Sequence, residues 1–201
     1  MIIDELTVGM VQTRCYILSP EGGQECIVID PGDEAARILK AAGNRKIAAI
    51  LLTHGHFDHI GAVGALCAAR NAECRMQNAE LKDEKTRIII HESDAPMLSD
   101  PALNAGMGLI GRQITAPEAT DLVREGDELT LAGLNVRVLH TPGHTPGSVC
   151  YLIEGELFTG DTLFDYGWGR TDLPGGNEAQ MEDSLRRLMP MVRSIPMHAG
   201  H

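Results

Sequence analysis

Residues 53–59 of this 201-residue chain, THGHFDH, concentrate side chains that bind metal ions. Three histidines, His54, His56 and His59, and the carboxylate of Asp58 fall within six positions. Neutral imidazole and carboxylate are preferred ligands of zinc and similar divalent ions. A lone histidine is more often a hydrogen-bonded core residue, but this density indicates a metal site.

Three glycine-rich turns further along the chain also carry ligand-type residues. They are HTPGHTPG at 140–147 with His140 and His144, TGDT at 159–162 with Asp161, and HAGH at 198–201 with His198 and His201. Glycine permits backbone conformations that a side chain would forbid, so such turns can aim one residue inward. We expect these turns to contribute to the site that residues 53–59 begin.

The element before the histidine cluster is an apolar strand at residues 46–53. Its lack of polar alternation predicts burial on both faces. A helix at about residues 58–70 follows, because apolar residues recur there at helical spacing. The order strand, ligand loop, helix places the cluster at the carboxyl end of a central strand, where open α/β sheets hold their ligands.

Further strands and helices are predicted on both sides of this unit. A hairpin is expected from residues 15–18 and 25–30, followed by a helix at about 34–42 that Asp33 caps. Residues 87–91 indicate a strand, 92–96 a helix start, and 98–120 an excursion with short helices. Strands are expected at 128–131, 134–140, 149–153 and 156–159, and Asn177 caps a final helix at about 178–189. This order predicts two sheets between helices.

Composition limits the class of protein. With 201 residues and 43% apolar content, we expect one folded domain over residues 1–201. The net charge of −11 argues against nucleic acid as a partner. No basic segment followed by an apolar run opens the chain, and no apolar stretch reaches the ~18 residues that span a bilayer. Five cysteines without a CxxC pair fit a reducing compartment. We therefore expect a cytoplasmic protein without membrane contact, and the oligomeric state stays open.

The motifs together resemble a known family. HxHxDH at residues 54–59, TPGHTPG at 141–147, TGD at 159–161 and the final GH resemble the metallo-β-lactamase fold over almost the whole chain. The chain is most similar to glyoxalase II-like hydrolases (hydroxyacylglutathione hydrolase-like) of the short, single-domain kind, whose segment after the bridging aspartate resembles GRTDLP at residues 169–174. This resemblance implies an α/β fold, a four-layer αββα sandwich of two mixed sheets flanked by helices.

The resemblance also implies a role for each ligand. The first metal would be held by His54, His56 and His144, the second by Asp58, His59 and His201, with Asp161 bridging both. His198 competes with His201 for the last position, and the Ala-Gly-His context favours His201. The printed sequence stops at His201, where relatives continue with glycine and a tail, so it is either truncated relative to a working enzyme or unusual at this end.

Three other residues are candidates for supporting the ligands or lining a pocket. His140 is expected to pack or to hydrogen-bond behind the ligands rather than to bind metal. Arg170 either pairs with Asp172 or helps to fix the loop of the bridging aspartate, and both interpretations stay open. His198 is the third candidate.

The expected chemistry is hydrolysis. A metal-bound water has a pKa near 7, so a metal-bound hydroxide can attack a carbonyl that an ion polarises. Asp58 would orient the attacking group and take its proton. Two divalent ions are expected, with zinc as the first choice and iron or manganese as alternatives. The resemblance points to small-molecule thioesters such as an acylglutathione, and a thiolate needs little help to leave.

Other functions stay open. The same fold hosts lactonases and other ester hydrolases. It also hosts persulfide dioxygenases, oxidoreductases that use a single iron held by the first-metal ligands and the equivalent of Asp161. A binding or structural role with an incomplete site is a further alternative. The commonest class B β-lactamases carry a cysteine at the position of Asp161, which argues against β-lactam cleavage.

Overall fold

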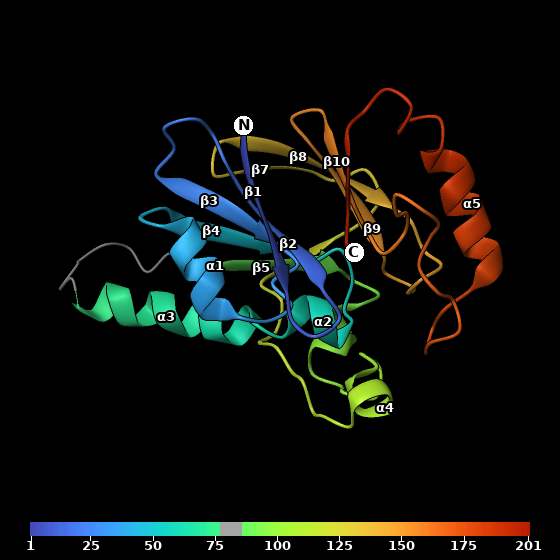
Figure 1. Cartoon of the computed structure of the whole chain (residues 1–201), viewed down its shortest axis with the longest axis horizontal. Coiled ribbons are helices and arrows are strands. Elements are labelled where there is room, and N and C mark those ends of the chain that lie inside the picture. Colours follow the sequence, from blue (N-terminus) through green and yellow to red (C-terminus); the bar gives the residue numbers. More distant parts are fainter. Residues whose placement is uncertain (77–85) are drawn as a thin grey trace.

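The computed structural model describes the backbone of residues 1–76 and 86–201. One sheet holds six strands in sequential order (Figure 1). They are β1 (Ile2–Val8), β2 (Thr13–Ser19), β3 (Glu25–Ile29), β4 (Lys46–Leu51), β5 (Arg87–His91) and β6 (Asp121–Val123). β2 pairs antiparallel with both β1 and β3, and β3 to β6 pair in parallel. The carboxyl ends of β3, β4 and β5 therefore meet at one edge of the sheet.

The second sheet holds five strands in the order β11-β10-β9-β8-β7. Their bounds are β7 (Glu128–Leu131), β8 (Leu134–His140), β9 (Val149–Ile153), β10 (Glu156–Gly160) and β11 (Met197–Ala199). Only β10 and β11 pair in parallel within it. Both sheets are thus mixed, as expected.

Side-chain alternation sorts the core into layers. In β2, Cys15 and Ile17 pack with helices α1 (Ala35–Ala42) and α3 (Val63–Met76), whereas Tyr16 and Leu18 face the second sheet. On the far side of that sheet, Leu157 packs with α5 (Glu178–Leu188). Figure 1 shows α1 and α3 on one side of the sheets and α5 at the other. The expected four-layer αββα sandwich is confirmed.

The segment after the histidine cluster is not one helix, as the spacing predicted, but two. Helix α2 (Phe57–Ile60) ends at Gly61, and α3 begins at Val63. The backbone N–H of Ala62 donates to the carbonyl of Pro31 at 2.9 Å instead of continuing the helix. A Cβ on Gly61 would lie 2.3 Å from the carbonyl oxygen of Gly32, so the break depends on this close approach to the turn after β3.

Other expected elements lie within a residue or two of their predicted bounds. Asn177 caps α5 through its side-chain oxygen, which accepts from the N–H of Gln180 at 3.1 Å. The first helix differs, because Glu34 in a left-handed conformation, not Asp33, occupies the N-cap of α1. The excursion contains the short helices η1 (Ala95–Leu98) and α4 (Gly106–Ile110). Strands β1, β6 and β11 had no individual prediction.

Within residues 1–76 and 86–201, no helix combines the length and the hydropathy that crossing a bilayer requires.

Candidate metal centre

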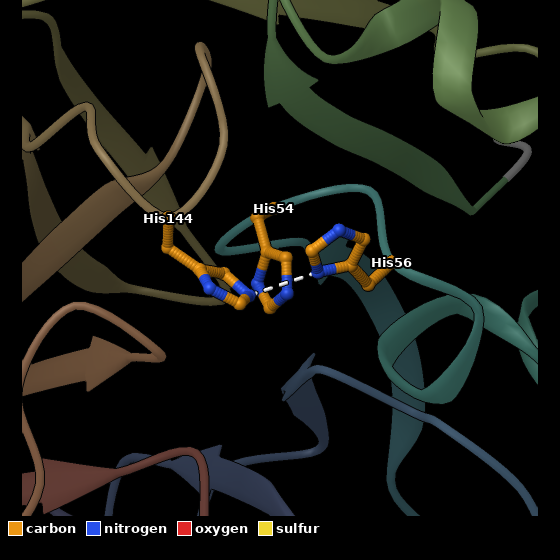
Figure 2. A group of neighbouring side chains, drawn as sticks. All are labelled: His54, His56 and His144. Carbon is orange, nitrogen blue, oxygen red and sulfur yellow. Dashed lines mark hydrogen bonds between the residues drawn. The ribbon is translucent and has the colours of Figure 1, made fainter. Parts of the chain in front are cut away.

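Three imidazole rings from two loops converge at one end of the sandwich. His54 and His56 follow β4, and His144 lies between β8 and β9. Figure 2 shows the rings facing one another across the gap between these loops. The ring centroids are 4.6–4.8 Å apart in each pair, and Nδ1 of His56 lies 2.8 Å from Nε2 of His144. One nitrogen from each ring can therefore reach a common point.

A second group lies directly beside the first. Asp58 and His59 belong to α2, and His201 follows β11. The Nε2 atoms of His59 and His201 lie 3.5 and 3.3 Å from Oδ2 of Asp58. The rings of His54 and His59 have centroids 4.1 Å apart, so the two groups are in direct contact.

Asp161, at the turn after β10, lies between the two groups. Its Oδ1 is 3.4 Å from Nε2 of His59, and its Oδ2 is 3.5 Å from Nε2 of His144 and 3.4 Å from Nε2 of His201. The carboxylate therefore contacts members of both groups, which is the geometry that a bridging ligand requires.

The donor atoms fit divalent metal ions. Buried Nε2 of His54, Nε2 of His59 and Oδ1 of Asp161 have no hydrogen-bond partner among the described residues. Buried polar atoms are nearly always hydrogen-bonded, because desolvation without compensation costs about 1–3 kcal/mol each. A set of unpaired imidazole and carboxylate atoms aimed at common points is what ion coordination would satisfy.

His54 and His56 are suited to bind metal at neutral pH without losing protons. Burial lowers the pKa of His54 well below 6.5, and the neighbouring His59 lowers it further. Burial and the nearby His144 lower the pKa of His56 to about 3. Both rings are therefore neutral, as ligands must be.

The second group is a network of opposite charges when no metal is bound. Burial alone would lower the pKa of His59, but Asp58 and Asp161 raise it well above 6.5. Burial also opposes charge on His201, whereas hydrogen bonds to Asp161 and Asp58 raise its pKa to about 9. Burial would raise the pKa of Asp58, and the charge of His59 outweighs it, which holds that pKa at about 2. A cation bound here would take the place of those protons.

Backbone carbonyls orient two of the ligand rings. Nδ1 of His144 donates to the carbonyl of Arg170 at 2.7 Å, and Nδ1 of His201 donates to that of Val11 at 3.1 Å. Each bond leaves Nε2 free to bind a metal. The side chain of Arg170 pairs with Asp172 through two 2.6 Å hydrogen bonds. The structure thus shows the first of the two interpretations, the pairing with Asp172, and the Arg170 carbonyl orients His144 rather than the loop of Asp161.

Asp30, at the end of β3, is a supporting residue that the sequence reasoning missed. Its carboxylate accepts from the N–H of Thr53 at 2.8 Å and from its hydroxyl at 2.6 Å. Since that hydroxyl proton is committed, Nδ1–H of His54 donates to Oγ1 of Thr53 at 3.1 Å. Oδ2 of Asp30 also lies 3.0 Å from Nδ1 of His59. The sequence feature that could have indicated Asp30 is an acidic residue directly after β3, the apolar strand that pairs with β4.

Thr13 was missed as well, and nothing in its local sequence marks it. Its hydroxyl donates to Oδ2 of Asp58 at 3.1 Å across 45 positions of sequence. The side chain is fully buried, so this bond is shielded from water. Thr13, the first residue of β2, thereby fixes the position of the Asp58 carboxylate.

Two predicted candidates lie outside the ligand groups. His140 stacks on His91 with centroids 4.1 Å apart, and its Nε2 lies 2.9 Å from the carbonyl oxygen of Pro146. His198 stacks on Phe158, and its Nε2 lies 2.9 Å from Glu156. The structure brings His201, not His198, to Asp58 and Asp161.

Comparison with known proteins gives a consistent family. The model of the Metallo-beta-lactamase superfamily matches residues 8–194. The chain is 33% identical to the probable metallo-hydrolase YqgX of Bacillus subtilis, covering 98% of this chain and 88% of that protein. It is 34% identical to the hydroxyacylglutathione hydrolase GloC of Haemophilus influenzae, covering 100% of this chain and 91% of the relative.

Solved structures agree. The BLEG-1 B3 metallo-beta-lactamase superposes with a TM-score of 0.86 at 35% identity, covering 100% of this chain and 91% of that one. TTHA1623 in a di-iron-bound form gives a TM-score of 0.80 at 32% identity, covering 98% and 91%. ETHE1 from Myxococcus xanthus gives 0.75 at 29% identity, covering 100% and 76%.

Proposed function

Since this chain belongs to the metallo-beta-lactamase superfamily, we propose that it is a metal-dependent hydrolase that holds two divalent ions and cleaves thioesters such as an acylglutathione. The observation that carries this proposal is Asp161 between two groups of ligand atoms, within 3.5 Å of members of both. The full-length similarity to a hydroxyacylglutathione hydrolase supports the thioester.

Seven side chains would hold the ions in this proposal. His54, His56 and His144 form the first set, Asp58, His59 and His201 the second, and Asp161 belongs to both. The ions would supply a nucleophile from water at neutral pH and polarise the substrate carbonyl. Zinc suits these nitrogen and oxygen donors, as do iron and manganese.

Asp58 is the residue of this chain to which we assign proton transfer. It is ionised at neutral pH, since its pKa lies at about 2. The Thr13 hydroxyl and Nε2 of His201 both lie beside Oδ2, at 3.1 and 3.3 Å, and neither contact uses Oδ1. That oxygen can orient a water molecule and accept its proton while the carbonyl is attacked.

The surroundings suit an uncharged organic acyl group. The turn at 164–167 lies beside the second group, because the Phe164 ring has its centroid 6.0 Å from that of His201. Tyr166 in this turn and Trp168 just after it are 99% and 61% exposed, and Val11 at the β1–β2 turn is also exposed. A thiolate, with a thiol pKa of about 8.5, leaves without needing a proton from the protein.

Metal analysis followed by a substrate panel tests the proposal. Protein purified without added metal should contain up to two divalent ions per chain, and the loaded protein should hydrolyse an acylglutathione. Asp58→Ala should abolish hydrolysis while the protein stays folded. A fully active Asp58→Ala variant would remove the proposed mechanism.

Two alternatives follow from specific likenesses. The similarity to ETHE1 keeps a mononuclear iron persulfide dioxygenase open; one iron per chain with oxygen uptake on glutathione persulfide would establish it against the hydrolase. The similarity to the BLEG-1 lactamase makes a β-lactam a necessary comparison substrate, although the family resemblance places Asp161 where the commonest class B enzymes have cysteine. A lactone completes the panel.

A further inference from the structure

Asp94 is a buried carboxylate that joins the two loops of the first ligand group. It follows β5, the strand beside β4, and its side chain is fully buried. Oδ2 accepts from the N–H of Gly55 at 3.1 Å and from the hydroxyl of Thr145 at 2.6 Å. Oδ1 accepts from the N–H of Gly147 at 2.7 Å.

These contacts lie directly at the ligands. Gly55 is the residue between His54 and His56, and Thr145 follows His144. The first loop comes from one sheet and the second from the other. Asp94 therefore sets how closely the His54–His56 loop approaches the His144 turn, a distance that neither sheet defines alone.

The space around Asp94 leaves little freedom. A Cβ on Gly147 would lie 2.6 Å from Oδ1 of Asp94, and a Cβ on Gly55 would lie 2.5 Å from Cβ of Met97 in the turn that Asp94 begins. Both glycines are thus required for the loops to reach the carboxylate. Among the described residues the carboxylate meets three donors and no acceptor, which fits an ionised side chain although burial raises its pKa.

The second ligand group is held by other contacts. Asp58 is bonded by Thr13, the N–H of Phe57 donates to the carbonyl of Asn104 at 3.0 Å, and Ala62 is bonded to Pro31. None of these bonds includes Asp94. Asp30, on the opposite side of β4, supports His59.

We propose that Asp94 is a positioning residue for the first metal: it clamps the loops of His54, His56 and His144 together and places a negative charge beside them. The inference rests on the proposed metal ligands. Supporting contacts behind metal ligands typically contribute about 10–100-fold to metal affinity or activity. The loss of Asp94 should therefore weaken the first metal and leave the second almost unchanged.

Asp94→Asn is the decisive variant, because it keeps the shape and removes the charge. The amide NH₂ must face at least one of the three donors, which replaces an attraction by a repulsion. Thr145→Val removes a single donor with almost the same volume. Asp121→Asn is the control, since Asp121 lies on neighbouring β6 and pairs with Arg87 through a 2.6 Å bond away from the ligand loops.

Zinc affinity is measured in two backgrounds, each of which retains one ligand group. His201→Ala keeps the first group, and His56→Ala keeps the second. Asp94→Asn should weaken zinc binding about 10–100-fold in the His201→Ala background and by less than about 3-fold in the His56→Ala background. Thr145→Val should show the same asymmetry at smaller size, and it provides the test if Asp94→Asn does not fold.

The outcomes separate the two proposals. Equal losses in both backgrounds, or no loss in either, would overturn the role of Asp94. If the parent protein binds none of zinc, iron and manganese, the proposed metal-dependent function fails first, and the role of Asp94 fails with it. Urea unfolding of the metal-free proteins shows that the asymmetry is not a difference in folding.

Discussion

Gly169 passes so close to the candidate site that a single added methyl group should disable it. Its N–H donates to the carbonyl of Asp161 at 3.0 Å. A Cβ at this position would lie 2.0 Å from that carbonyl oxygen and 2.9 Å from Nδ1 of His144. The backbone of Gly169 is not left-handed, so the conflict in Gly169→Ala is purely steric.

The size of the effect follows from this distance. Relief of the overlap requires a shift of at least about 1 Å to reach the shortest separation at which a real Cβ is found. The shift also moves the next carbonyl, that of Arg170, away from Nδ1 of His144, which it now accepts from at 2.7 Å. A 1 Å misplacement can cost about 100-fold in rate, and overpacking costs about 1–3 kcal/mol of stability.

The assay combines hydrolysis of an acylglutathione, metal content and urea unfolding of Gly169→Ala. We expect about a 100-fold loss of kcat/KM and weaker binding of the first metal. Gly64→Ala in α3 is the matched control, because its Cβ would meet only Pro117 at an ordinary 3.7 Å, and alanine favours the helix. Gly169→Ala with two bound metals and parental activity would refute the steric argument.

Three further predictions concern metal binding and pH. Asp30→Asn should lower the affinity for both metals by about 10–100-fold, unlike Asp94→Asn, because Asp30 supports His54 through Thr53 and contacts His59. Competition with a chromophoric chelator measures the two affinities. A loss of affinity for one metal alone would contradict the prediction. Zinc at 100 times its Kd should stabilise the metal-free protein by about 2.7 kcal/mol and raise Tm by about 5–10 °C, as calorimetry can show; an unchanged Tm would argue against a site. Burial and His140 lower the pKa of His91 to about 4, so the unfolded chain takes up a proton below pH 6.5 that the folded protein takes up only near pH 4. The free energy of unfolding should therefore decrease as the pH is lowered from 6.5 to 4. His91→Asn should remove about 1–3 kcal/mol of this decrease, measured by urea titrations at pH 7 and 5. An identical decrease in both proteins would exclude the effect.

Local sequence determined much of the fold. Strands with clear alternation or a continuous apolar run, such as β5 and β8, have the bounds that their patterns predicted, because burial of one or both faces requires those patterns. Asn177 correctly predicted the start of α5, because its side-chain oxygen accepts a hydrogen bond from the N–H of Gln180. Short strands such as β11 were not predicted, because three residues carry too little periodicity. The pairing partner β10 also lies far from β11 in the sequence.

The sequence by itself also determined the kind of chemistry, because histidine and aspartate at this density in tight turns have few uses apart from metal binding. Only the tertiary structure decided which residues meet. It separates His201 from His198, although they are three positions apart, because His201 lies past the end of β11 while His198 packs on Phe158. It also brings Asp94 to the ligand loops. Parallel strands place their ends at one edge of the sheet, and that long-range pairing is not written in the residues near any one ligand.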